Sequence, residues 1–121
     1  DRDNLMLHAA FQILVDYMEK EKPGEVLSWN WRADHTKAWR TLRALYKWWT
    51  VTRPARTDPD TALLSVPLTF KQRLENIGGE KILHTPYIKA SLRSGKLQEK
   101  WHAEDDRQLH RLIDVRLFMW T

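Results

Sequence analysis

The chain contains no cysteine among its 121 residues, which excludes a disulfide framework and a thiolate metal site. No apolar run approaches the roughly 18 residues of a membrane span, and no signal-peptide pattern opens the chain. A phosphate-cradling Gly-rich loop and the Gly-x-Ser-x-Gly nucleophile elbow are also missing. These absences predict a soluble, intracellular protein and favour binding over catalysis.

Tryptophan is the residue that the chain has in excess. Seven are present, and each buries a large area while its indole N–H still needs a partner. Apolar residues make up 42% of the chain and charged residues 30%, which is typical of a globular protein. Because this length fits one hydrophobic core, we predict a single domain over residues 1–121.

The N-terminal region predicts a long helix. Asp3 or Asn4 can cap it, and it runs to about Lys22, where Pro23 and Gly24 stop it. Its apolar residues cover more than half of the helical wheel, so we expect a central position.

A second helix is predicted from a cap at Asp34 to about Thr50, ended by Pro54. Its wheel separates two faces, with Trp48 at the margin between them. The apolar stripe is formed by Ala38, Trp39, Leu42, Leu45, Tyr46 and Trp49. The opposite, basic face is formed by Lys37, Arg40, Arg43 and Lys47.

The remaining segments predict connectors and shorter helices. In "SWNWR", Trp29 and Trp31 are expected to pack on the core from an extended connector. The proline-containing stretch up to about Val66 is expected to form a loop. Two short helices should follow, over 69–77 and from Thr85 to about Gly95.

The last helix is predicted to begin near Lys96 or after Trp101 and to run to the C-terminus. Its apolar side is formed by Leu97, Trp101, Leu109, Leu112, Ile113, Leu117 and Trp120. Without a strong period-2 strand or a repeat, the chain is predicted to be all-α. We expect three main helices and two short ones, with Trp39, Trp49, Trp101 and Trp120 in the core.

Two parts of the chain resemble a known group of proteins. These are "LHAAFQILVDYMEKEKP" followed by "LYKWWTVTRPAR", and the C-terminal "WHAEDDRQLHRLIDVRLFMWT". They are similar to small, functionally uncharacterised proteins of tailed bacteriophages, in which an N-terminal helix, a "WWTVxRPxR"-like segment and a "RLxxxRxxLWT"-like end recur. The resemblance covers residues 4–57 and 98–121 and leaves a variable basic middle over 58–97. It implies a phage or prophage origin and the cytoplasm of an infected bacterium, and it brings no activity or catalytic residue with it.

Positive charge concentrates in the interior of the chain, although the net charge is only +4. Lys and Arg outnumber Asp and Glu by 7 to 1 over residues 32–56 and by 7 to 3 over residues 71–100. This asymmetry indicates an anionic partner, either nucleic acid or an acidic host protein. The predicted contact residues are Lys37, Arg40, Arg43, Lys47, Trp48, Arg53 and Arg56, followed by Lys89, Arg93 and Lys96. Alternatively, the charges only solvate an outer face and Trp48 packs on the following loop.

A second predicted cluster is buried and polar. Asp105 and Arg116 fall on the apolar side of the last helix, about 16 Å apart along its axis, so they cannot pair with each other. The polar wedge of the first helix offers partners for them, namely His8, Gln12, Asp16 and Glu19. Because a buried charge needs a partner, we expect an ion pair of Arg116 with Asp16 or Glu19.

The same residue types leave two metal sites as alternatives. Asp16 and Glu19, together with His102, Glu104 or Asp105, resemble carboxylate sets that hold Mg²⁺ or Mn²⁺ in helical nucleotide pyrophosphatases. His102, Asp106 and His110 have a spacing that could ligate Zn²⁺. A solvated helical face explains this second set more simply.

Together these patterns favour a small accessory protein that acts by binding, without a cofactor, as an inhibitor of a host nucleic-acid machine or defence complex. Two alternatives stay open, a carboxylate-metal-dependent hydrolase of nucleotides and a structural virion component that self-associates.

Overall fold

The structure, a computed structural model, describes residues 2–61 and 85–120. The chain divides into two compact units. Unit 1 comprises Asp1–Arg56 with Glu104–Thr121, and unit 2 comprises Thr57–Ala103. All regular elements in the described ranges are helical, with no strand, which confirms the all-α class.

The N-terminal helix α1 spans Arg2–Asp16, and a wider helical turn, η1, continues it over Tyr17–Glu21. Leu7, Phe11 and Leu14 are buried because spacings of three and four residues place them on one face. The helix stops at Lys22, as predicted, where the backbone adopts a left-handed conformation with φ 48° and ψ 58°.

A short helix, α2 (Pro23–Val26), leads into the connector before α3. Trp29 in the connector is buried, and its Nε1 donates a hydrogen bond to the Pro23 carbonyl oxygen at 3.1 Å. Trp31 is 62% exposed and lies against His35, with ring centroids 4.4 Å apart. The prediction that both indoles pack on the core is therefore confirmed for Trp29 and wrong for Trp31.

The helix α3 spans Ala33–Lys47, and the wider turn η2 continues it over Trp48–Thr52. Arg32, in an extended conformation, precedes the first turn; Asp34 lies inside that turn rather than at the predicted cap. The Asp34 carboxylate accepts a hydrogen bond from the His35 backbone N–H at 3.0 Å. A negative charge is favourable there because it faces the positive end of the helix dipole.

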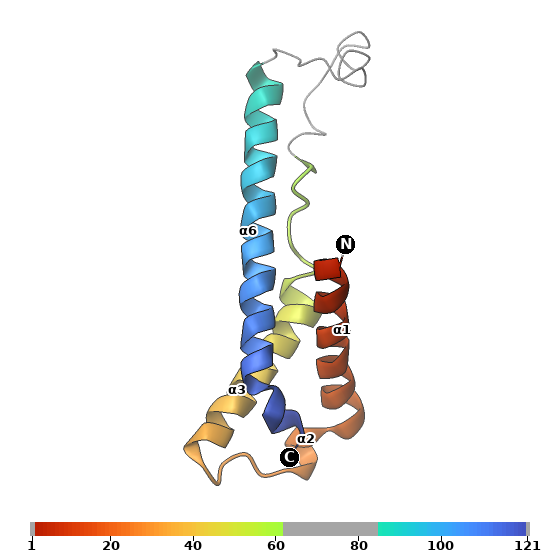
Figure 1. The fold of residues 1–121 in the computed structure, drawn as a ribbon, viewed down its shortest axis with the longest axis vertical. Helices are drawn as coiled ribbons and strands as arrows, with labels where there is room; N and C mark the ends of the chain where they lie inside the picture. Colours follow the sequence, from red (N-terminus) through yellow and green to blue (C-terminus); the bar gives the residue numbers. More distant parts are fainter. Residues whose placement is uncertain (1, 62–84, 121) are drawn as a thin grey trace. The chain divides into compact units, whose positions relative to one another are not determined.

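Unit 1 packs around the buried face of α1 and α3, which lie side by side in Figure 1. Its core cluster consists of Leu7, Phe11, Leu14, Tyr17, Trp29, Leu42, Leu45, Trp48 and Leu112. The ring of Phe11 stacks on Trp49 at a centroid distance of 4.7 Å and lies 5.3 Å from Trp48. The Trp-rich core is thus confirmed, but its two buried tryptophans are Trp29 and Trp48.

The four tryptophans predicted for the core have other positions. Trp39 and Trp49 are half-buried and pack against the cluster from its edge. Trp101 belongs to unit 2, where its Nε1 donates to the Thr57 carbonyl oxygen at 3.0 Å. Trp120 is 75% exposed, so its assignment to the core was wrong.

The C-terminal helix α6 spans Thr85–Val115 without interruption, followed by η3 (Arg116–Trp120). The prediction that a helix closes near Gly95 is therefore wrong. One glycine costs a helix interior only about 1 kcal/mol, and the good helix formers around it compensate. The predicted helix over 69–77 lies outside the described residues.

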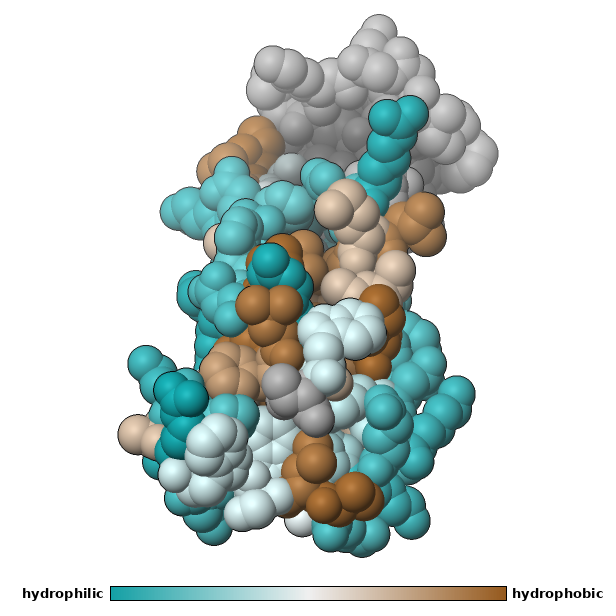
Figure 2. Space-filling model, turned by 60° about the horizontal axis from the view of Figure 1, so that its bottom comes forward, coloured by the Kyte–Doolittle hydropathy of each residue, from teal (hydrophilic) through white to brown (hydrophobic). Residues whose placement is uncertain are grey.

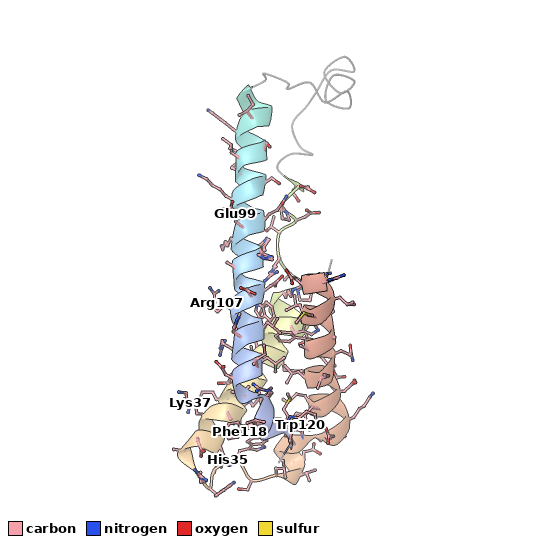
Figure 3. All side chains as sticks on the ribbon, viewed as in Figure 1. His35, Lys37, Glu99, Arg107, Phe118 and Trp120 are labelled. Carbon is pink, nitrogen blue, oxygen red and sulfur yellow. The ribbon has the colours of Figure 1, made fainter. Side chains whose placement is uncertain are left out.

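The segment η3 closes one end of unit 1. Phe118 meets the ring of His35 edge to face, at a centroid distance of 5.1 Å (Figure 3). Figure 2, with this end turned forward, shows hydrophobic residues among hydrophilic ones. The exposed large apolar side chains of α2, the connector and η3 include Val26, Trp31, Leu117 and Trp120.

Unit 2 holds a small buried site on α6. Ala90 and Ser94 are buried, and the Ser94 hydroxyl donates to Asp60 Oδ1 at 3.3 Å. Within residues 2–61 and 85–120, no helix combines the length and apolarity that crossing a bilayer requires.

Candidate functional site

The basic face of α3 is exposed, as the helical wheel predicts. Lys37, Arg40, Arg43 and Lys47 all point to solvent, and Lys37 is labelled in Figure 3. Within the part of the chain that the structure describes, none of these four pairs with a carboxylate. By contrast, the cations Lys20, Arg32, Arg53 and Arg56 each have a carboxylate within 4 Å. The face of α3 therefore carries positive charge that the described protein does not neutralise.

Three of these four cations line a groove on unit 1, with a volume of about 710 Å³. We call it the α3 groove. Its lining includes the cations Arg40, Arg43 and Lys47, together with Met18, Trp39 and Tyr46. Lys37 does not contribute to the lining. The groove thus combines unneutralised positive charge with two aromatic side chains.

The indole of Trp39 is held in place by its neighbours. It stacks on Trp29 with a centroid distance of 4.9 Å and an interplanar angle of 16°. Gly24 approaches its edge so closely that a Cβ atom there would lie 2.9 Å from Trp39 Cζ2. The guanidinium carbon of Arg43 lies over the same ring, 6.0 Å from its centroid. Trp39 is consequently a fixed aromatic surface next to exposed cationic side chains.

Tyr46 is tied to the last turn of the first helix. Its hydroxyl donates a hydrogen bond to Glu19 Oε2 at 3.0 Å. This hydrogen bond, with a smaller effect of burial, raises the pKa of Tyr46, so the hydroxyl stays neutral. The wheel placed Trp39 and Tyr46 in the core stripe, but both lie at its edge and are half-buried. Arg43 follows Trp39 by four residues, and this spacing predicts that the two side chains lie close together on α3.

Three other predicted contact residues are turned inward. Trp48 is only 6% exposed, and its Nε1 donates to Glu104 Oε1 at 2.6 Å. Arg56 binds Glu104 at 2.8 Å and Asp105 at 2.7 Å, while Arg53 Nε lies 3.1 Å from Asp105. The placement of Trp48 at the margin of the basic face is wrong, and Arg53 and Arg56 do not extend that face.

These three side chains are turned inward because α6 supplies carboxylates that bind them. Trp48 and Trp49 follow Leu45 by three and four residues, so both can face the core. The Glu104 carboxylate on α6 accepts a hydrogen bond from the indole N–H of Trp48, and the guanidinium of Arg56 lies 5.4 Å from the centroid of the Trp48 ring. Arg53 lies 4.8 Å from the centroid of Trp49 in the same way. A wheel of α3 alone contains none of this information.

The two acids of this network are ionised in the folded chain. Burial disfavours the charge of Asp105, but hydrogen bonds from Arg53 and Arg56 outweigh it and lower the pKa of the carboxyl. Burial likewise opposes ionisation of Glu104, but hydrogen bonds from Arg56 and Trp48 lower its pKa. The cluster is therefore an ion-pair network that joins the end of η2 to α6.

The predicted buried pairing between the first and last helices is wrong. Arg116 is exposed, and its guanidinium donates to the Ile113 carbonyl oxygen. Asp16 accepts a hydrogen bond from Gln12 at 3.0 Å and pairs with Lys20 at 3.3 Å. His8 lies edge-on against Trp49 at a centroid distance of 4.9 Å. Asp105 finds its partners, Arg53 and Arg56, in the turn that follows η2 instead.

In the described ranges, no group of three or more His, Asp or Glu side chains is placed to hold a metal ion. Asp16 and Glu19 have partners on their own helix and on α3, and Asp105 is bound by two arginines. His102, Asp106 and His110 form no such group either.

The remaining predicted contact residues lie on the part of α6 that belongs to unit 2. Lys89, Arg93 and Lys96 are exposed, with spacings of four and three residues that place them on one helical face. They form a second basic row.

Comparisons with protein-family models, with curated proteins and with solved structures find no match to this chain. No residue role is therefore taken over from a relative. The candidate site rests on the exposure, charge and geometry of the α3 groove.

Proposed function

We propose that the protein acts by binding a polyanion along the basic face of α3. The observation that carries this proposal is the clustering of Arg40, Arg43 and Lys47 in one groove without a carboxylate partner among the described residues. Because these exposed cations are not paired with a carboxylate of the described chain, their charge is available to an anionic binding partner. The anions that match them are the phosphates of a nucleic acid and the carboxylates of an acidic protein surface.

The resemblance of both chain ends to small tailed-phage proteins extends the proposal. In an infected bacterium, the polyanion would be nucleic acid or the acidic face of a host nucleic-acid machine or defence complex. A basic protein that occupies either one blocks the access of the natural partner, which is how an inhibitor without catalytic residues works.

Electrostatic binding of this kind has a measurable signature. For a single strand, whose salt slope is about 0.7 per neutralised phosphate, three or four phosphate contacts should make affinity fall about 20- to 50-fold between about 50 and 200 mM salt. Binding that does not depend on salt would contradict the proposed role of these cations.

The decisive variant is Arg40→Glu with Arg43→Glu, which reverses two charges in the groove. The matched control is Arg111→Glu with Arg116→Glu, which changes the net charge equally at two exposed positions outside α3. Affinity for single-stranded DNA, duplex DNA, RNA and polyglutamate is measured by fluorescence anisotropy at low salt, with circular dichroism to confirm the fold. We expect the groove variant to lose binding at least about tenfold more than the control.

Two results would overturn the proposal. In the first, the parent protein binds none of these polyanions at low salt. In the second, the groove variant and its control lose the same affinity, which would mean that only net charge matters.

A further inference from the structure

We infer that the α3 groove takes single-stranded nucleic acid, with a base stacked on Trp39 and the flanking phosphates on Arg40, Arg43 and Lys47. This inference rests on the proposed polyanion binding and names its partner. The contacts that support it concern the aromatic side of the groove, which charge alone does not explain.

The indole ring of Trp39 is held in a fixed orientation by a stacked neighbour on one of its two faces. Trp29 covers one face of the ring at 4.9 Å and is itself fixed by its hydrogen bond to Pro23. Arg43 lies 6.0 Å from the ring centroid, at the outer limit of about 6 Å for a cation–π contact. A long, exposed arginine side chain at that distance can move aside, so a flat ligand can enter against the ring without rearranging the core.

An aromatic surface selects a base over a carboxylate. The face of an indole carries a negative electrostatic potential, so it repels an anion that lies on it, whereas a nucleobase stacks on it favourably. An acidic peptide would gain from the three cations but not from Trp39. The combination of both features in one groove therefore favours nucleic acid.

The same argument favours a single strand over a duplex. Bases inside a duplex are already stacked on one another, while those of a single strand are free to stack on a protein side chain. The groove, at about 710 Å³, falls in the range of about 300–1,000 Å³ that accommodates small organic ligands. It is large enough to hold a base.

The three cations of the groove lie on one face of α3. Arg40, Arg43 and Lys47 follow one another by three and four residues, so they form a row about 10 Å long on α3. A row of this length contacts only a short stretch of backbone. The site should accordingly take a few nucleotides rather than a long strand.

The test compares two ligands of equal charge on the parent protein. One is a 12-nucleotide single strand of deoxythymidine, and the other is the same backbone with abasic sugars. Stacking contributes enough that the abasic strand should bind at least about fivefold more weakly. A duplex of the same length should also bind more weakly than the single strand.

A pair of variants then assigns the effect to one ring. Trp39→Leu keeps an apolar side chain against Trp29 but removes the aromatic face, so it should lose the preference for the strand with bases. Its affinity for the abasic strand should fall by less than its affinity for the strand with bases. The matched control is Trp31→Leu, at a tryptophan that is 62% exposed outside the groove, and it should keep both affinities.

The outcomes separate the two proposals. Equal affinity of the parent for both strands overturns the inference and leaves polyanion binding standing. Tighter binding of polyglutamate than of the deoxythymidine strand overturns it in favour of an acidic protein. If the parent protein binds none of these ligands, both proposals are overturned. If Trp39→Leu does not fold, the comparison of the two strands on the parent decides alone.

Discussion

Asp105→Asn should destabilise the fold, because Asp105 holds two arginines that no other described carboxylate can fully satisfy. It accepts hydrogen bonds from Arg53 at 3.1 and 3.3 Å and pairs with Arg56 at 2.7 Å. Only 19% of its side chain is exposed, and Arg56 is exposed by only 11%. The substitution keeps the size of the side chain and removes its charge, so its effect reports on the ion pairs.

The expected magnitude follows from these contacts. A hydrogen bond to a charged group contributes about 1.5–3 kcal/mol, and breaking a fully buried ion pair costs about 3–5 kcal/mol. Asp105 is partly exposed, Arg56 keeps Glu104, and an asparagine oxygen still accepts one hydrogen bond. We therefore expect a loss of about 2 kcal/mol at pH 7, which lowers Tm by about 8 °C.

The loss of stability caused by Asp105→Asn should also become smaller as the pH falls. Because the folded chain lowers the pKa of Asp105 from its ordinary value of 3.8, its ionised form stabilises the fold above that value. This contribution is lost as the pH falls from 3.8 through the lower pKa of the folded state. The difference between the parent and the variant should thus be full at pH 7 and pH 5, and smaller at pH 3.

Urea denaturation followed by circular dichroism at these three pH values measures the difference. Asp106→Asn is the matched control, since Asp106 is the exposed neighbour, and it should change stability by less than about 0.5 kcal/mol. The reasoning is refuted if both variants behave alike at pH 7, or if the effect of Asp105→Asn is undiminished at pH 3.

Three further predictions concern other contacts of unit 1, each measured by urea denaturation at pH 7. Gly24→Ala should cost about 1–2 kcal/mol, because its Cβ would lie 2.9 Å from the fixed ring of Trp39; unchanged stability would contradict this close packing. Lys22→Gly should instead raise stability by about 0.5–1 kcal/mol, since glycine adopts the left-handed φ of 48° without strain, and a destabilised variant would argue against that conformation. Trp48→Ala should cost about 3–5 kcal/mol, while Trp31→Ala, at an exposed indole, should cost under about 1 kcal/mol. Similar losses for the two would mean that Trp48 is not the buried member.

Much of the helical structure follows from local sequence signals. The all-α class, the end of the N-terminal helical segment (α1 with η1) at Lys22 and the two faces of α3 all agree with local signals in the sequence. These features depend on hydrogen bonds and side-chain spacing within one helix, so the sequence of that helix is sufficient to predict them. The stop predicted near Gly95 fails for the converse reason, because a single glycine weakens a helix without ending it.

What the sequence alone determined is therefore which residues face the same side of each helix, including the exposed basic row of α3. Only the tertiary structure decided which side chains at the edges of those faces are covered. Trp48 is buried because Glu104, 56 residues later, binds its indole, and Arg53 and Arg56 are drawn from the basic surface by the acids of α6. Trp39, at the other edge, stays half-buried and lines the α3 groove. Burial at a helix edge depends on partners distant in the chain, and periodicity within one helix carries no information about them.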